Sequence, residues 1–292
     1  MSGLLFWNCR GAKKVEAALY LREAIKDHGV IFVGLLETRI NNVENNQIMK
    51  LLADNWKFFM VPSVGLSGGL LILWRCDLAD FTVVKHSSQM VVGNLKMINK
   101  GDWKIALVYG STDVQERKFL WEDLGRQCDD DSPLIIGGDF NCILSQEEKR
   151  GGKKFKMNQG SKDFPSFMIN NDLHLVNSMG PKYTWCNNKS GSNRIWEKLD
   201  RCLINSSAMN FLHLALVKHL PRFASVHCPL VMELFKPVNS VRKDIRYEEV
   251  WATYYGATAL VKKIWEKKCS GNPAVILSKK CKKTLRALFF WS

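Results

Sequence analysis

Short apolar runs of strand length recur along this sequence, and they constrain its fold more than any other feature. They are rich in β-branched and aromatic residues and occupy residues 4–8, 31–36, 56–61, 69–74, 81–84, 90–96, 103–109, 134–136, 182–185, 199–204 and 230–234. Runs of this length between turn-forming residues are typical of buried or half-buried β-strands. None of them approaches the roughly 18 apolar residues that a membrane-spanning helix requires. The sequence therefore predicts large β-sheets and no transmembrane segment.

Helical segments are predicted between some of these strands. Apolar residues recur at helical spacing in residues 15–25, 48–52, 119–124 and 164–168, and Ser161 is a candidate N-cap for the last of these. Between residues 56 and 109 the strand-like runs follow one another without helices, which favours antiparallel hairpins over strand–helix–strand repeats. We expect an α/β (α+β) fold in which mainly antiparallel sheets are covered by helices on their outer faces.

The distribution of charge and of strands divides the chain into two parts. The whole chain has a net charge of +14, and residues 236–292, with 13 basic and four acidic side chains, carry +9 of it. The strand pattern stops near residue 236, and lysine pairs then alternate with tryptophan, tyrosine and phenylalanine. We expect a domain of residues 1–235 and a basic, aromatic-rich helical tail or linker of residues 236–292. This tail either packs on the core or binds a protein partner.

An excess of positive charge is typical of proteins that bind a polyanion such as DNA. Inside the first part, basic residues surround Gly151 and Gly152; they are Lys149, Arg150, Lys153, Lys154 and Lys156. This composition predicts a flexible basic loop that contacts phosphate. A solvated run of charges without a partner is an equally good interpretation of the loop by itself.

The N-terminus and the cysteines indicate the compartment. The first residues lack the basic region and the small-residue cleavage site of a secretory signal. The nine cysteines are an odd number and contain no C-x-x-C pair, which disfavours a disulfide framework or a zinc site. We expect a nuclear or cytoplasmic protein with reduced thiols that is not secreted.

Polar residues that suit metal and phosphate chemistry follow the ends of several predicted strands. They are Asn8, Glu37, Asp139, Asn141, Asp200 and His227. Side chains at strand ends gather at one edge of a sheet, where ligands bind in many α/β folds. Carboxylate and amide oxygens are the ligands that Mg²⁺ prefers, together with water and substrate phosphate oxygens. The pattern therefore predicts phosphoester chemistry assisted by Mg²⁺, with Mn²⁺ as the alternative ion.

Six motifs occur in the order that is found in the endonuclease/exonuclease/phosphatase superfamily, which this sequence resembles over residues 3–234. They are Trp7-Asn8-Cys9-Arg10-Gly11, Leu36-Glu37-Thr38, Val108-Tyr109-Gly110, Gly138-Asp139-Phe140-Asn141, Leu199-Asp200-Arg201 and the Ser-x-His-x-Pro-Leu pattern of residues 225–230. Residues 148–152 and 183–187 also look like the endonuclease of plant LINE-type (non-LTR) retrotransposons. The resemblance implies a deoxyribonuclease-like, four-layer sandwich of two packed, mainly antiparallel sheets flanked by helices.

The resemblance also implies a role for each residue of the predicted site. Glu37 holds the metal and Asn8 supports it, while Tyr109 contacts the phosphate. Asp139 and Asn141 orient the attacking water and the phosphate, and Asp200 fixes the tautomer of His227. We assign water activation to Asp139 and phosphate stabilisation to His227, and the reverse assignment is the alternative. The expected nucleic-acid contacts are Lys149, Arg150, Lys153, Lys154, Trp185, Asn187 and Arg201. Without the family match, Glu37 is an ordinary strand-end acid and Asn8 a turn cap.

Two positions depart from the superfamily pattern. Repair endonucleases carry an acidic residue two positions after the first-strand Asn. This chain has Arg10 there, and the LINE subgroup commonly has arginine at this position too. The usual motif before the histidine is Ser-Asp-His, whereas this chain has Val226 in place of the aspartate. Since valine can neither ligate a metal nor accept a proton, we expect weaker metal binding and reduced activity.

Together these features predict a retrotransposon-derived endonuclease that nicks duplex DNA, weakened by Val226. Two alternatives remain open at this point. One is a catalytically impaired remnant that binds nucleic acid, which Val226 favours. The other is a small-molecule phosphoesterase of the same fold, which the basic loop at residues 149–156 disfavours.

Overall fold

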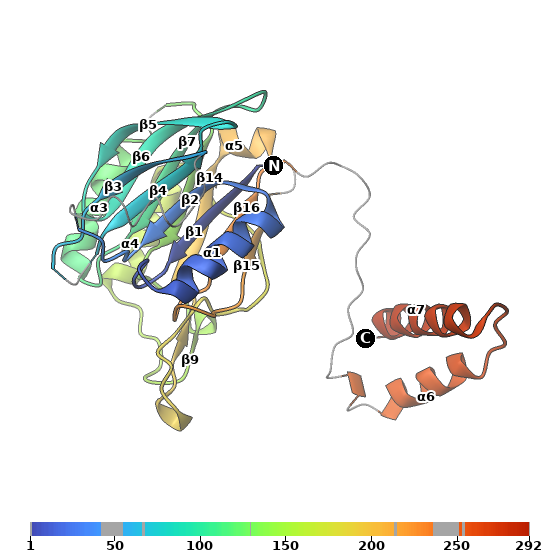
Figure 1. Cartoon of the computed structure of the whole chain (residues 1–292). Helices are drawn as coiled ribbons and strands as arrows, with labels where there is room; N and C mark the ends of the chain where they lie inside the picture. Colours follow the sequence, from blue (N-terminus) through green and yellow to red (C-terminus); the bar gives the residue numbers. More distant parts are fainter. Residues whose placement is uncertain are drawn as a thin grey trace. The chain divides into compact units, whose positions relative to one another are not determined.

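The chain was analysed in a computed structural model that describes residues 2–41, 55–65, 68–128, 130–212, 215–235, 251–252 and 255–291. It forms two compact units, Met1–Lys236 and Pro237–Ser292 (Figure 1). The helix predicted within residues 48–52 lies outside the described residues.

Two mixed β-sheets make up the centre of the first unit. The strands of one sheet are β1 (Gly3–Asn8), β2 (Val30–Leu36), β3 (Trp56–Val61), β4 (Leu70–Arg75), β11 (Ser178–Met179), β15 (Val217–His219) and β16 (Leu230–Glu233). Those of the other are β5 (Ala79–His86), β6 (Met90–Met97), β7 (Gly101–Tyr109), β8 (Leu134–Asp139), β10 (Leu173–Leu175) and β14 (Asp200–Asn205). The strand orders are β11-β15-β16-β1-β2-β4-β3 and β10-β14-β8-β7-β6-β5. Most neighbouring strands are antiparallel; β1/β2, β7/β8 and β11/β15 are parallel.

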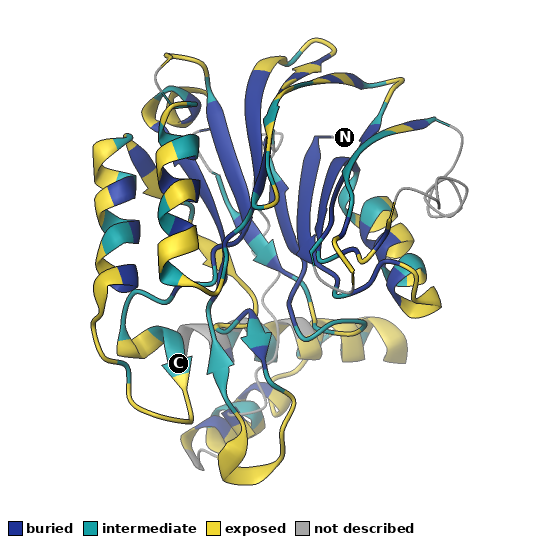
Figure 2. Cartoon of the chain, turned by 90° about the vertical axis from the view of Figure 1, so that its left-hand side faces the viewer, coloured by how far each residue is buried: buried dark blue, intermediate teal, exposed yellow. Residues whose placement is uncertain are grey.

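Helices cover the outer face of each sheet, which completes four layers and confirms the predicted fold class. On one side lies α1 (Val15–His28), and on the other lie α3 (Val114–Gly125) and α4 (Gln159–Asn170). A short helix, α5 (Ser206–Phe211), follows β14. Figure 2 shows the strands buried in the middle of the unit and the helices with exposed outer faces. Helix α4 begins after Asn158, so the predicted cap at Ser161 is wrong: Asn158 is the N-cap, and Ser161 is the third residue of the helix and bonds back to Asn158 in a capping box.

Alternation along β1 divides the core between two layers. Leu4 and Phe6 point into the space between the sheets, while Leu5 and Trp7 point toward α1. The sheets interdigitate at two glycines. A Cβ atom on Gly137 of β8 would lie 2.4 Å from the ring of Phe6, and one on Gly34 of β2 would lie 2.6 Å from the side chain of Leu107. Each glycine therefore leaves room for a large side chain of the opposite sheet.

A small third sheet consists of β9 (Lys149–Arg150), β12 (Trp185–Cys186) and β13 (Trp196–Glu197), in the order β12-β13-β9. Two sequence predictions are corrected here. Of the strand predicted at 182–185, only Trp185 lies in a strand, β12. The neighbouring Thr184 uses its hydroxyl to accept the backbone N–H groups of Leu199 and Asp200. The basic loop is not flexible throughout, since its first two residues pair with β13.

The second unit is a helical hairpin of α6 (Tyr255–Trp265) and α7 (Pro273–Trp291). Trp251, Ala257 and Leu288 form its small buried core. The indole N–H of Trp265 donates to the hydroxyl of Thr284 at 3.0 Å and so joins the two helices. Among the described residues, no helix combines the length and the apolar character needed to cross a bilayer.

Replacing Gly137 by alanine should destabilise the first unit by about 1–3 kcal/mol, because the new methyl group overlaps the Phe6 ring inside a packed core. Urea denaturation would measure the change. Gly125→Ala at the end of α3 is the matched control, since it adds the same methyl group at a helix terminus beside the Asn171 amide. Equal stabilities for the two variants would contradict the close packing of the sheets at Gly137.

Candidate active site

The ends of several strands meet at one edge of the two sheets. In the first sheet β1 and β2 run parallel with Asn8 opposite Leu36, so Glu37 follows directly beside Asn8. In the second sheet Tyr109 lies opposite Asp139 in a parallel pair, and Asp200 lies opposite Asp139 in an antiparallel pair. The register of these strands therefore brings the predicted residues of both sheets to the same edge.

The side-chain amide of Asn8 connects the two sheets. Its Nδ2 group donates to Glu37 Oε1 at 2.8 Å and to Asp139 Oδ2 at 3.0 Å. Glu37 Oε1 also accepts a hydrogen bond from the Tyr109 hydroxyl at 3.2 Å, and Glu37 Oε2 accepts one from Arg10 Nε at 3.2 Å. The structure thus brings Asn8, Glu37, Tyr109 and Asp139 into one hydrogen-bonded cluster.

Asn141 is positioned by the loop that follows β8. Its backbone N–H donates to Asp139 Oδ1 at 3.0 Å, and its side-chain Nδ2 donates to the carbonyl oxygen of Gly110 at 2.8 Å. Asn141 and Glu37 have φ angles of 46° and 49°, in the left-handed region that non-glycine residues rarely adopt. Backbone strain of this kind concentrates at functional sites, where the surrounding structure holds it in place.

His227 and Asp200 form a buried pair next to Asp139. His227 Nδ1 lies 3.0 Å from Asp200 Oδ2 and 3.7 Å from Asp139 Oδ2. Two residues that we did not predict hold this pair in place. The Thr184 hydroxyl anchors the backbone of Asp200, while the Ser225 hydroxyl accepts the His227 N–H and donates to the Asn8 carbonyl at 2.7 Å. Both belong to motifs quoted from the sequence, which was the available signal.

Burial and crowding shift the pKa values of the cluster. Burial, followed by the negative charge of Asp200, raises the pKa of Asp139 from 3.8 to about 6. Burial by itself lowers the pKa of His227, but the Asp200 and Asp139 carboxylates outweigh it and raise that pKa above its ordinary value. Burial and the Glu37 carboxylate raise the pKa of Tyr109, so its hydroxyl stays protonated. The site therefore pairs a weakly acidic carboxyl group with an imidazole whose pKa is raised.

The residues of the cluster suit a divalent cation. Asp139, Asp200 and His227 each offer a ligand atom within 4.8 Å of the others, and all three are buried. Glu37 lies outside this set and joins it only through the Asn8 amide. The Oδ1 atom of Asn8 is buried without a hydrogen-bond partner. Several carboxylates and an unsatisfied amide oxygen form a hard-oxygen donor set that fits Mg²⁺ or Mn²⁺.

Comparison with known proteins gives the family. Residues 5–210 match the Endonuclease/Exonuclease/phosphatase family. The chain belongs to this family. His227 lies beyond the matched residues. We include it in the site of this chain because of its contacts with Asp200 and Asp139. No curated protein sequence matches significantly.

Solved structures of two endonucleases and a phosphatase share the fold of this chain. The endonuclease domain of TRAS1, a telomere-specific non-LTR retrotransposon, is 14% identical with a TM-score of 0.58, covering 81% of this chain and 99% of that one. The AP endonuclease LMAP from Leishmania major is 17% identical with a TM-score of 0.64, covering 81% and 88%. A 3′ phosphatase from Neisseria, bound to a product DNA hairpin, is 13% identical with a TM-score of 0.59, covering 81% and 100%.

The predicted nucleic-acid contacts fall into two groups. Lys149, Lys153 and Lys154 line a cavity of about 520 Å³ that Asn141 also lines. The half-buried Trp185 ring has its centre 6.5 Å from that of His227, whereas Arg150 is exposed on β9. The lysines of this cavity and Trp185 thus lie beside members of the cluster, although the Lys149 ammonium also pairs with Glu197.

Arg201 and Asn187 also make contacts inside the protein. The Arg201 side chain is only 1% exposed and pairs with Glu148, so it has a structural role, and its contact with nucleic acid stays a prediction that this burial disfavours. It also donates to the carbonyl oxygen of Cys142 and thereby fixes the loop after β8. The Asn187 amide is partly used within its own turn, accepting from Ile195 N and donating one of its two N–H groups to Asn193 O, so its contact with nucleic acid stays a prediction.

The raised pKa of Asp139 predicts how the free energy of unfolding of the metal-free protein depends on pH. The unfolded carboxyl group ionises near pH 3.8 and the folded one near pH 6, so the folded state is penalised increasingly as pH rises between these values. Asp139→Asn removes this penalty. Its stability relative to the wild type should therefore rise by up to about 3 kcal/mol from pH 4 to pH 7. Urea unfolding in EDTA measures it, and a pH-independent difference would contradict the shift.

Proposed function

We propose that this chain is a metal-dependent phosphodiesterase that nicks duplex DNA, of the type encoded by plant LINE-type retrotransposons. The observation that carries the proposal is the buried cluster in which Asn8 joins Glu37 to Asp139 beside the Asp200–His227 pair. Family membership places the chain among nucleases and phosphatases. The finer assignment to DNA rests on the surroundings of the cluster.

Each residue of the cluster has a chemical task in phosphodiester hydrolysis. The Asp139 carboxylate, held by the Asn8 amide and the Asn141 N–H, orients the attacking water and takes its proton. The pKa of about 6 makes this carboxyl group a stronger base than an ordinary aspartate. His227, kept protonated by Asp200, places positive charge beside the phosphate as negative charge develops on it.

Glu37 and Asn8 would hold a bound divalent cation beside Asp139. When bound, Mg²⁺ neutralises phosphate charge and so lowers the barrier to attack. The Tyr109 hydroxyl keeps its proton and donates a hydrogen bond to Glu37 in the free protein. The same hydroxyl is available to a phosphate oxygen once substrate or metal engages Glu37.

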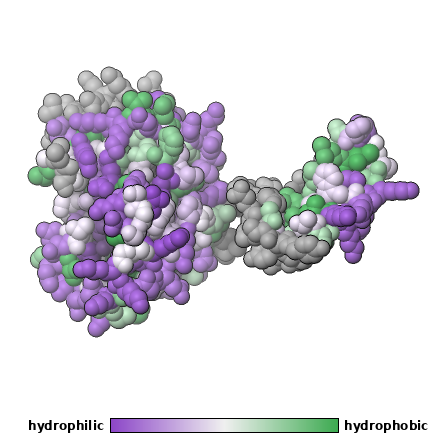
Figure 3. Space-filling view, turned by 90° about the horizontal axis from the view of Figure 1, so that it is seen from below, coloured by the Kyte–Doolittle hydropathy of each residue, from purple (hydrophilic) through white to green (hydrophobic). Residues whose placement is uncertain are grey.

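The surface around the cluster favours nucleic acid over a small phosphoester. A cavity with Lys149, Lys153, Lys154 and Lys156 on its walls reaches Asn141. The face of the first unit toward which β1 and β2 point is largely hydrophilic (Figure 3). Because backbone phosphates supply most of the affinity in non-specific DNA binding, basic side chains beside a phosphoesterase cluster suit a polynucleotide.

The retrotransposon origin is supported by two observations. One solved neighbour is the endonuclease domain of a non-LTR retrotransposon. The other is Arg10, which stands where repair endonucleases of the superfamily have an acid and where the LINE subgroup commonly has this residue. Val226 favours a second candidate, a remnant that binds nucleic acid without cutting it, because this side chain replaces a metal-binding carboxylate.

A plasmid-nicking assay with Mg²⁺ and with Mn²⁺ tests the proposal. We expect the wild type to convert supercoiled DNA into nicked circles, and Asp139→Ala to reduce the rate by at least about a hundredfold, since it removes the proposed base. Lys26→Gln, an exposed change in the last turn of α1 outside the cluster, should retain most of the rate. No nicking by the wild type with either ion, combined with retained DNA binding, would favour the remnant.

Val226→Asp should lower the Mg²⁺ concentration at which nicking is half-maximal when DNA is saturating. The change adds a hard oxygen donor next to His227, and a gain of about 1.4 kcal/mol in transition-state stabilisation would raise the rate about tenfold. Val226→Asn is the matched control, because it has the shape of aspartate without the charge. Identical Mg²⁺ titrations for the two variants would show that this carboxylate does not limit activity.

A further inference from the structure

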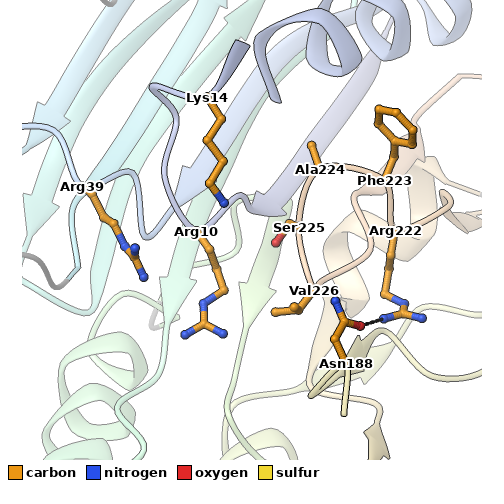
Figure 4. A pocket seen from close by; sticks show the side chains of 9 residues that line it. All are labelled: Arg10, Lys14, Arg39, Asn188, Arg222, Phe223, Ala224, Ser225 and Val226. Atoms are coloured by element: carbon orange, nitrogen blue, oxygen red, sulfur yellow. Dashed lines mark hydrogen bonds between the residues drawn. The ribbon is translucent and has the colours of Figure 1, made fainter. Parts of the chain in front are cut away.

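A second cavity, of about 460 Å³, lies beside the catalytic cluster and is lined by basic side chains. Its lining includes Arg10, Lys14, Arg39 and Arg222, together with Ser225 and Val226. Arg10, Lys14 and Arg39 come from one wall, and the loop of residues 222–226 forms the other (Figure 4). The cavity is separate from the one at Asn141, and none of these four cations was among the predicted DNA contacts.

Positive charge in this cavity exceeds the negative charge that faces it. Glu37 Oε2 lies 3.2 Å from Arg10 Nε and 3.9 Å from Arg39 Nη2. For Lys14 and Arg222 the structure records no carboxylate partner among the described residues. The guanidinium carbon of Arg222 instead lies over the Trp196 ring, 4.3 Å from its centre, and Nη1 lies 3.4 Å from Asn188 Oδ1. One carboxylate therefore contacts two of the four cations, and no carboxylate is among the described residues that line the cavity.

The backbone brings these side chains together before any ligand arrives. Gly11, with φ of 112°, lies between two of them: a Cβ atom here would be 3.6 Å from Lys14 Cε and 3.9 Å from Arg39 Cδ. Arg10 and Arg39 have φ angles of 47° and 55°, a strained conformation for arginine. The side chains of Arg10 and Arg39 are about two-fifths exposed and so remain accessible to a ligand. Cations that the backbone holds together in this way form a preorganised site for an anion.

The cavity adjoins the catalytic cluster through two residues. Glu37 presents Oε1 to Asn8 and Tyr109 on the cluster side and Oε2 to the arginines on the cavity side. Val226, on the cavity wall, precedes His227 directly. An apolar residue at this point leaves the cavity with one carboxylate less than an aspartate would give, which favours an anion there.

We infer that this cavity binds a phosphate group that neighbours the one being cleaved, and so positions the substrate strand. The guanidinium groups of Arg10 and Arg39 and the ammonium of Lys14 match the charge and the hydrogen-bonding capacity of phosphate oxygens. The inference rests on the proposed function, in which the substrate is a polynucleotide. A free phosphate ester would satisfy the same chemistry, and the test distinguishes the two sources.

The test compares Lys14→Gln and Arg222→Gln with Lys26→Gln in the full chain. Lys14 and Lys26 are exposed lysines at opposite ends of α1, so the control removes the same charge far from the cavity. Binding of duplex DNA is measured in EDTA across a salt titration. We expect each cavity variant to bind roughly five- to tenfold more weakly near 0.1 M salt, with a log–log slope flatter by about 0.9. Lys26→Gln should match the wild type.

A second arm measures binding of inorganic phosphate to the wild type and to Lys14→Gln. Phosphate binding that Lys14→Gln abolishes, together with unchanged DNA binding, would assign the cavity to a free phosphate group. Equal behaviour of all three variants toward both ligands would overturn the inference. Nicking by the wild type that depends on Asp139 would then still support the proposed function. If Lys14→Gln and Arg222→Gln selectively weaken DNA binding but the wild type does not nick DNA, the proposed function alone fails.

Discussion

Phe6 lies against Gly137, and this contact locks the two sheets together next to the polar cluster. Side chains on a strand alternate between faces, so Asn8 points the same way as Phe6 and Asp139 the same way as Gly137. Packed sheets normally lie about 10 Å apart, so side chains of the two sheets meet only where both point into the space between them. Gly137 leaves room for the ring of Phe6, and two residues further along each strand the Asn8 amide reaches Asp139 at 3.0 Å. The packing contact at Phe6 and the hydrogen bond at Asn8 therefore belong to the same faces of the same two strands.

The cluster concentrates negative charge in a buried place, which is unfavourable for folding and useful for catalysis. Asp139 and Asp200 lie opposite each other on adjacent strands, and burial together with the charge of Asp200 raises the pKa of Asp139. The protein offsets this cost with the protonated imidazole of His227 and the amide of Asn8 instead of with lysine or arginine at the centre. Donors of this kind hold the carboxylates in place without neutralising them fully, so a cation or a transferred proton still finds a favourable position there.

Much of this arrangement was predictable from the sequence, and the failures have physical reasons. Asn8, Glu37 and Asp139 each follow an apolar run, so their position at strand ends could be read locally, and their meeting followed from the family resemblance. The burial of Arg201 could not be read in this way, because it depends on Glu148, 53 residues away in the chain. The cavity beside the cluster was equally hidden, since four separate segments contribute to it and none is unusual by itself.

Glu37 gives one oxygen to Asn8 and the other to Arg10, which lines the basic cavity, and this division has a thermodynamic consequence for the two proposed sites. A carboxylate shared by a metal site and an anion site couples them, so that a cation bound on one side and an anion bound on the other change each other's affinity by the same factor. Metal titrations of this protein would then give different midpoints in phosphate buffer and in a buffer without small anions. The choice of buffer becomes an experimental variable for this protein.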